Sequence, residues 1–129
     1  MNSGSTLIFA EDTHLNIKPE GSLNAVGTEE KPILFTAEQE ISGFWKGIQF
    51  TFSDHEENEI AHAVMEYGGN GAGAVVLFGN VTSNASNLTL TNSLIQYSGE
   101  FGVWLHDASH LSATGNSYNN NQLGDIFVE

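Results

Sequence analysis

Residues 88–93 read LTLTNS, and residues 111–117 read LSATGNS, a degraded copy of the same stretch. Leu88 and Leu111 are 23 residues apart, and the same step separates the apolar triplets that begin at Val103 and Ile126. A repeat of this size, made of strands and turns, is typical of a solenoid in which each turn buries its apolar side against its neighbours. The repeat therefore predicts stacked coils of β-strand.

Short strands are expected along the whole chain, because apolar and polar residues alternate as they do when successive side chains point to opposite faces. Helical periodicity is almost absent, and glycines and asparagines fall mostly between the apolar runs, where turns need them. We divide the chain into about five turns: residues 6–28, 32–52, 58–79, 87–106 and 111–129. The expected strands are residues 7–9, 15–17, 23–26, 33–36, 48–52, 60–67, 74–78, 88–90, 103–105 and 126–128.

The third turn is longer than the two that follow it, since Tyr67 and Tyr97 are 30 residues apart. We expect the excess to form a surface loop, because ordering many glycines is entropically costly. Two segments qualify: GGNGAG at residues 68–73, and residues 79–86.

Composition limits the partners of the chain. The 129 residues are expected to form one domain, residues 1–129, with a continuous core. A formal net charge of −13, with three lysines as the only cations other than histidine, argues against nucleic acid and against anionic membrane surfaces. Cysteine is absent, which excludes disulfides, and no apolar run approaches membrane-spanning length. Residues 1–6 lack the pattern of a signal peptide, so we expect a cytoplasmic protein or one with a trimmed leader.

Three motifs in order carry a family resemblance: GSLNAVGT at residues 21–28, PILFT at residues 32–36 and GFWKGIQF at residues 43–50. The chain thereby resembles the right-handed parallel β-helix repeat proteins, the pectin-lyase-like superfamily in its non-enzymatic-looking bacterial branch. The resemblance implies an all-β, right-handed, single-stranded parallel β-helix of about five turns, and a secreted or cell-surface location. It is weak for function, because this fold hosts many activities and also inert surface domains.

Two further features are expected of such a coil. Asn92 and Asn116 should fall at corresponding corners, where asparagine tolerates left-handed φ and can bond its stacked copy. Both ends of a short solenoid leave strand edges unpaired, and no amphipathic capping helix is evident. We therefore expect end-to-end or side-by-side association, or a piece of a longer protein.

Catalytic chemistry has little support, and we expect no catalytic residues and no cofactor. Lyases of the resembling family use a basic residue, but this chain lacks arginine and its lysines fall in the first two turns. Glycoside hydrolysis needs converging carboxylates, whereas Asp107 and Asp125 are single carboxylates on different turns and are explained as turn residues. Nucleophilic catalysis lacks a cysteine and a nucleophile-elbow motif.

One acidic segment, residues 54–59 together with His62, could collect oxygen ligands for a cation. Its spacing fits neither an EF-hand nor a histidine-based zinc motif. The segment is better explained as a solvated charge run, so we expect no metal site.

The most usable feature is the outward side of the late strands. If Val103 and Leu105 point into the core, the intervening side chains point out, and stacking of the turns predicts an exposed stripe. The stripe contains Val76, Phe78, Trp104, His106 and Phe127. Self-association, a loop around residues 44–45 that covers the stripe, and a platform for sugar rings all remain open.

These observations favour a non-enzymatic structural or interaction module that forms a homo-oligomer through the stripe. The alternative is a carbohydrate-binding module, or a degenerate polysaccharide-active β-helix, with carbohydrate as the partner.

Overall fold

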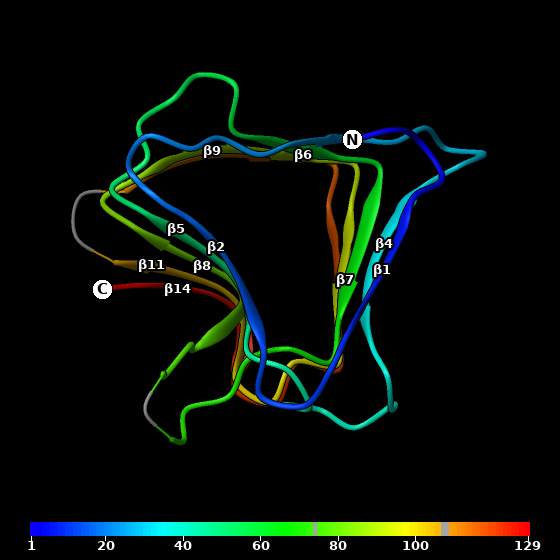
Figure 1. The fold of residues 1–129 in the computed structure, drawn as a ribbon, viewed down its shortest axis with the longest axis vertical. Helices are drawn as coiled ribbons and strands as arrows, with labels where there is room; N and C mark the ends of the chain where they lie inside the picture. The colour runs from blue at the N-terminus through cyan, green and yellow to red at the C-terminus, as the bar shows by residue number, and fades with distance from the viewer. Residues whose placement is uncertain (74, 107–108) are drawn as a thin grey trace.

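The computed structural model of the chain describes residues 1–73, 75–106 and 109–129. Within these ranges the chain forms fourteen β-strands and no helix, and the strands build three parallel sheets. Figure 1 shows the sheets as the three sides of a triangular coil, which winds clockwise as it recedes from the N-terminus. The prediction of an all-β, right-handed parallel β-helix of about five turns is thus confirmed, and the hand is the one that right-twisted strands favour.

Every third strand belongs to the same sheet. The first sheet consists of β1 (Thr6–Phe9), β4 (Ile33–Ala37), β7 (Ala63–Glu66), β10 (Leu94–Gln96) and β13 (Ser117–Asn119). The second sheet consists of β2 (His14–Ile17), β5 (Gly47–Thr51), β8 (Gly79–Asn84), β11 (Phe101–His106) and β14 (Gly124–Val128). The third sheet consists of β3 (Asn24–Val26), β6 (Glu59–Ala61), β9 (Asn87–Thr91) and β12 (His110–Thr114).

The strand register confirms the 23-residue repeat. Leu88 pairs with Leu111 between β9 and β12, and Val103 pairs with Ile126 between β11 and β14. Identical positions therefore lie on adjacent coils, separated by the spacing of about 4.8 Å between neighbouring strands.

Alternating side chains fill the interior. Ile48, Val81 and Val103 stack on consecutive strands of the second sheet, and each is completely buried. On the first sheet, Phe35, Met65 and Ile95 form the equivalent buried column. Burying a side chain of this size contributes about 1.5–3 kcal/mol, so these columns hold adjacent coils together.

Most corners of the triangle are turned by residues in the left-handed region. Because this conformation crowds Cβ, it is uncommon outside glycine, asparagine and aspartate. Among the described residues, eight that are not glycine adopt it: Asp12, Phe52, His62, Tyr67, Ala85, Asn92, Tyr97 and Asn120.

At several corners, a serine or asparagine side-chain oxygen accepts a backbone N–H from the neighbouring coil. Ser53 donates its backbone N–H to Ser86 Oγ at 2.9 Å, and Ser86 donates in turn to Ser109 Oγ at 3.2 Å. At a different corner, Ser93 donates to Asn116 Oδ1 at 3.0 Å. These columns satisfy backbone donors at points where the strand ladder is interrupted.

The prediction that Asn92 and Asn116 occupy corresponding positions is wrong by one residue. The register of β9 and β12 aligns Asn92 (φ 50°) with Gly115 (φ 72°), so both take the left-handed conformation. Asn116 aligns instead with Ser93, and its Nδ2 donates to the Leu90 carbonyl at 2.8 Å.

Two expected strands are also wrong. Residues 60–67 form two strands rather than one, because His62 takes φ 49° and turns the chain from β6 into β7. Residues 75–78 lie outside the named strands and Ala74 lies outside the described residues, whereas residues 79–84 form β8. The surplus of the third turn is therefore an excursion that begins at the glycine-rich segment, and residues 79–86 are not a loop.

The two ends of the coil differ in exposure. Among residues 109–129, all of which are described, no side chain is buried. In the first coil, by contrast, Ile17 and Ala25 are buried. Within the described residues there is also no helix with the length and hydropathy that a membrane span requires.

Candidate interaction surface

The predicted stripe lies on the outer face of the second sheet. The strand ladders place Gln49, Thr82, Trp104 and Phe127 in one outward column, from β5 to β14. The column is polar in the earlier coils and aromatic in the last two. The aromatic end therefore occupies the part of this face that adjoins the exposed last coil.

Three of the predicted aromatic side chains contact one another. The Trp104 and Phe127 rings stack with centroids 4.4 Å apart and planes inclined by 20°, and the Phe78 ring lies 4.6 Å from Trp104. A further ring was missed by sequence reasoning: Phe101 lies 5.6 Å from Trp104 and 5.0 Å from Phe127. We call these four residues the ring cluster. Aromatic pairs at such distances contribute about 0.5–1.5 kcal/mol beyond their buried area.

Val76 and Phe78 reach this surface by a route that differs from the prediction. They do not stack on Trp104 as members of the preceding strand, because Thr82 of β8 occupies that position. They come from the excursion of residues 70–78, and the Phe78 carbonyl accepts a hydrogen bond from Phe101 N–H at 2.8 Å. The loop that borders the stripe is thus the glycine-rich excursion.

The covering loop expected around residues 44–45 has a different role. Trp45 is completely buried in the core, where its ring stacks on Phe9 at 4.0 Å and its Nε1 donates to the Glu66 carbonyl at 2.8 Å. This tryptophan therefore belongs to the interior of the coil and does not cover the ring cluster.

The excursion is tied to the coil at its base. Asn70 donates from Nδ2 to the Gly43 carbonyl at 2.9 Å, and the Lys46 ammonium group donates to the Ala72 carbonyl. Lys46 is only 4% exposed. These contacts hold the segment that carries Val76 and Phe78 beside the second sheet.

A groove of about 300 Å³ runs between the excursion and the sheet. The apolar lining residues are Val76, Phe78 and Trp104. The polar lining residues are Gln49, Thr82, Asn84, His106 and Glu129. Thr82 Oγ1 and Asn84 Oδ1 are buried and have no hydrogen-bond partner. Buried polar atoms are normally paired with protein or ordered water, so these two atoms are exceptions.

His106 lies in this groove opposite the C-terminal residue. Its Nδ1 is 2.6 Å from Glu129 Oε2, and the backbone N–H of Glu129 donates to the Leu105 carbonyl at 2.9 Å. The side chain of His106 thus links β11 to the residue that follows β14, at the edge of the ring cluster.

The orientation of the rings limits what they can bind. Trp104 is stacked on Phe127 and makes tilted contacts with Phe78 and Phe101, so much of its indole is already in contact with protein rings. The rings of this cluster that are most open to a stacking sugar ring are Phe78 and Phe127, which are 36% and 38% exposed.

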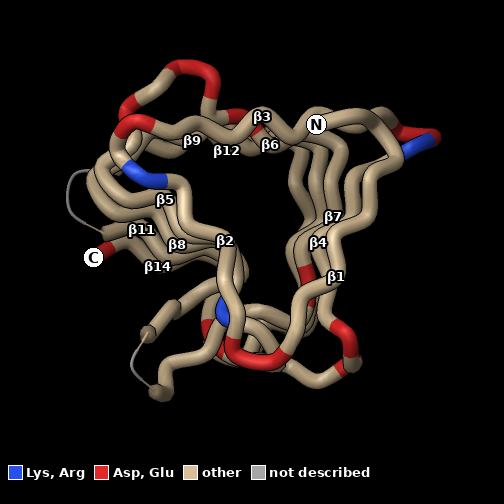
Figure 2. Tube along the Cα trace, in the orientation of Figure 1, with Lys and Arg blue, Asp and Glu red and all other residues tan. Residues whose placement is uncertain are grey.

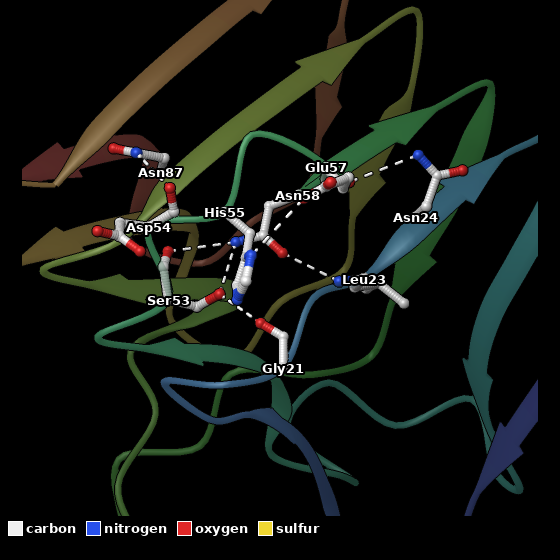
Figure 3. Close-up of polar contacts among 9 residues, drawn as sticks. All are labelled: Gly21, Leu23, Asn24, Ser53, Asp54, His55, Glu57, Asn58 and Asn87. Carbon is white, nitrogen blue, oxygen red and sulfur yellow. Dashed lines mark hydrogen bonds and ion pairs between the residues drawn. The ribbon is translucent and has the colours of Figure 1, made fainter.

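The acidic segment at residues 54–59 is a surface loop that is anchored to the coil through Asn58 (Figure 3). Asn58 is 1% exposed; its Oδ1 accepts the Leu23 N–H at 2.9 Å, and its Nδ2 donates to Ser53 Oγ at 2.8 Å. His55 Nδ1 lies 3.6 Å from Glu57 Oε2 on the surface. The described residues contain no group of three histidine, aspartate or glutamate side chains that could hold a metal ion. Of the two single carboxylates considered earlier, Asp125 lies in β14, and Asp107 lies outside the described residues.

Charge is distributed mainly over the turns. Figure 2 shows acidic segments gathered at the corners and loops of the coil, with only isolated basic ones. Burial is the main reason that the pKa of Tyr67 is raised, and the carboxylates of Glu40 and Glu66 raise it further. Burial likewise raises the pKa of Tyr118, although a hydrogen bond with Asn116 acts in the opposite direction.

The fold and this surface together define the class: a short right-handed parallel β-helix that carries an aromatic ring cluster at one end of one outer face. Comparison with protein-family models, with curated proteins and with solved structures found no match.

Proposed function

We propose that this chain is a non-enzymatic structural module, of the pectin-lyase-like kind that its motifs resemble, which self-associates through the ring cluster. The supporting observation is the exposure of contiguous apolar side chains: Phe78 is 36%, Val76 38% and Phe127 38% exposed. Contiguous apolar surface of this kind marks an interaction site on a soluble protein. Packing of the same surface of a second copy against these side chains would exclude water from them.

The formal charge of −13 opposes this association, because like-charged copies repel one another. The contact therefore has to depend on burial of apolar area rather than on charge pairing. At 0.1 M ionic strength, salt largely screens the repulsion between exposed charges that are more than about 10 Å apart. Association should therefore strengthen as salt is added.

The variant Phe78→Ser tests this proposal. Phe78 lies in the excursion and outside every strand, so its replacement should leave the coil folded. We expect the wild-type chain to sediment as a dimer or larger species, and the concentration at half-association to rise at least about tenfold in the variant, equivalent to about 1.4 kcal/mol. Sedimentation velocity measures this directly.

The control for that experiment is Ile41→Ser. Ile41 is 53% exposed in a turn and does not line the groove. Its replacement should leave the sedimentation profile unchanged. A wild-type chain that stays monomeric at its highest soluble concentration would refute self-association.

A carbohydrate-binding module is the second candidate, and the groove beside the ring cluster favours it. Thr82 Oγ1 and Asn84 Oδ1 lack partners there, and a hydroxyl-rich ligand could donate to both. Binding to a glycan array that is lost in Asn84→Leu and reduced in Phe127→Ala, with Ile41→Ser unaffected, is the result expected of this candidate. An array without binding to the wild-type chain would exclude it for the glycans tested.

A further inference from the structure

Lys46 is a buried cation in a strongly acidic chain. It is 4% exposed, whereas the other two lysines, Lys18 and Lys31, are exposed. A lysine is almost never buried to this extent without an anionic partner, because its charge loses its hydration. Within the described part of the chain, the ammonium group donates only to the Ala72 carbonyl and pairs with no carboxylate, although it carries three N–H donors.

Neighbouring coils on both sides account for this burial. Lys46 lies in the second coil, and its backbone N–H donates to the Thr13 carbonyl of the first coil at 2.7 Å. Its own carbonyl accepts the Gly69 N–H of the third coil at 2.9 Å. The excursion then covers the end of the side chain through Ala72. The surroundings of the ammonium group are therefore set by the interior of the coil and not by where the chain starts or stops.

A pocket of about 330 Å³ adjoins this ammonium group. Its lining includes Lys46 together with Ala72 and Gly73 of the excursion. A Cβ placed on Gly73 would lie 3.4 Å from Lys46 Nζ, so the ammonium nitrogen sits at the pocket wall. Pockets of this size are at the lower end of those that bind small molecules. The unused N–H donors are thus within reach of an anionic group of a small ligand.

The same pocket also carries a negative group. Asp12 lines it from the first coil, where its backbone N–H donates to the Phe44 carbonyl at 2.9 Å, and its carboxylate forms no ion pair with Lys46. A simple anion would be attracted by Lys46 but repelled by Asp12 and by the net charge of −13. A ligand with a negative and a positive group side by side would meet a complementary charge at each end of the pocket.

We propose that this pocket binds a free aliphatic α-amino acid, with its carboxylate at Lys46, its ammonium group at Asp12 and its side chain against Val75. Val75 belongs to the lining and is 37% exposed, so an aliphatic side chain placed there would bury apolar surface. Asn70 shapes the pocket and does not bind the ligand, because both ends of its side-chain amide are already bonded to backbone groups. This site is separate from the ring cluster and goes beyond the function proposed above.

Amide NMR titration of the isotope-labelled chain with L-alanine, L-valine and L-leucine tests the site. We expect saturable shifts centred on Ala72, Gly73 and Val75, which line the pocket. Two probes each lack one charge of valine: isovalerate lacks the ammonium group, and isobutylamine lacks the carboxylate. Each should bind at least about tenfold more weakly than L-valine. Isovalerate that binds as tightly as L-valine, or no saturable shift with any of the three amino acids up to about 10 mM, would overturn the proposal.

Lys46→Met tests the carboxylate end of the site. Methionine fills a similar volume without the charge, and an apolar replacement of a buried charge is often tolerated. We expect binding of both L-valine and isovalerate to be lost, with the circular dichroism spectrum unchanged. Lys18→Met is the matched control, because it removes the same charge from an exposed side chain outside the pocket. Unchanged L-valine affinity in folded Lys46→Met would exclude Lys46 as the carboxylate partner.

Asp12→Asn tests the ammonium end and does not depend on a buried position. Asp12 is exposed and has φ 60°, a conformation that asparagine tolerates, so the variant should fold. L-valine should bind at least about tenfold more weakly, whereas isovalerate should bind more tightly because a repelling carboxylate is gone. A general distortion of the pocket would weaken both probes. Glu11→Gln, the neighbouring exposed carboxylate outside the pocket, should change neither affinity. Equal weakening of both probes in Asp12→Asn, or no change in L-valine affinity, would overturn the proposal.

Discussion

Replacing Asn80 with alanine should lower the free energy of unfolding by about 3–5 kcal/mol, one of the largest effects expected of any single substitution in this chain. Asn80 is completely buried at the start of β8. Its Oδ1 accepts the Gly68 N–H at 2.6 Å, and its Nδ2 donates to the carbonyls of Met65 and Gln96 at 3.1 and 2.9 Å. Alanine would leave three backbone groups without these partners, at about 1–3 kcal/mol each.

The reason that one side chain serves three backbone groups lies in the excursion. At the equivalent corner one coil later, Ser98 N–H donates to Asn121 Oδ1 on the next coil at 3.0 Å. The corner at Gly68 uses Asn80 instead, which lies beyond the excursion in sequence. Asn80 therefore closes the base of the excursion and also completes the corner column.

Urea unfolding followed by circular dichroism measures the effect of Asn80→Ala. The midpoint should fall while the slope stays close to that of the wild type, since the surface exposed on unfolding is nearly unchanged. Asn121→Ala is the matched control: it removes two equivalent bonds at a half-buried site in the last coil and should cost about 1 kcal/mol. Asn80→Ala with a loss no larger than that of the control would contradict this account.

The sequence predicts the coil well because its evidence is periodic. Alternation and the 23-residue step identify strands at Val103 and Ile126, and the register places these residues in contact. The corners are harder to predict. Several of them are formed by residues of types that rarely adopt left-handed φ, such as Phe52, Tyr67 and Ala85. Their conformation is imposed by stacking on neighbouring coils, which no local pattern reports.

The ring cluster, too, could be predicted from the sequence only in part. Trp104 and Phe127 are predictable because they share an outward column in paired strands. Phe101 is not, since alternation alone would place it inward with Val103, whereas its ring lies beside Trp104 and Phe127. Phe78 arrives by the excursion, and sequence alone could not decide between residues 68–73 and 79–86 for that loop. The pairing of Phe78 with Trp104 was anticipated, but from an incorrect strand assignment.

Trp45→Ala should destabilise the fold by about 3–5 kcal/mol, although Trp45 lies in a turn rather than in a strand. Its side chain fills the core between the first two coils, with no exposed surface, a stacked Phe9 ring at 4.0 Å and a hydrogen bond from Nε1 to the Glu66 carbonyl. Alanine would leave a large cavity and an unpaired carbonyl. Trp45→Phe keeps most of the ring contact but removes the donor, so it should cost less, about 1–3 kcal/mol.

Trp104, the other tryptophan of the chain, provides a control for this prediction. Trp104 is half-buried on the outer face, so Trp104→Ala removes surface contacts with Phe78 and Phe127 without opening a core cavity. Denaturation should therefore show a smaller loss for Trp104→Ala than for Trp45→Ala. Tryptophan emission should also be shifted further to the red in Trp45→Phe, where only Trp104 remains, than in Trp104→Phe. If Trp104→Ala proved the more destabilising change, the contacts of Trp104 with its neighbouring rings would contribute more to stability than the buried Trp45, and this account would be contradicted.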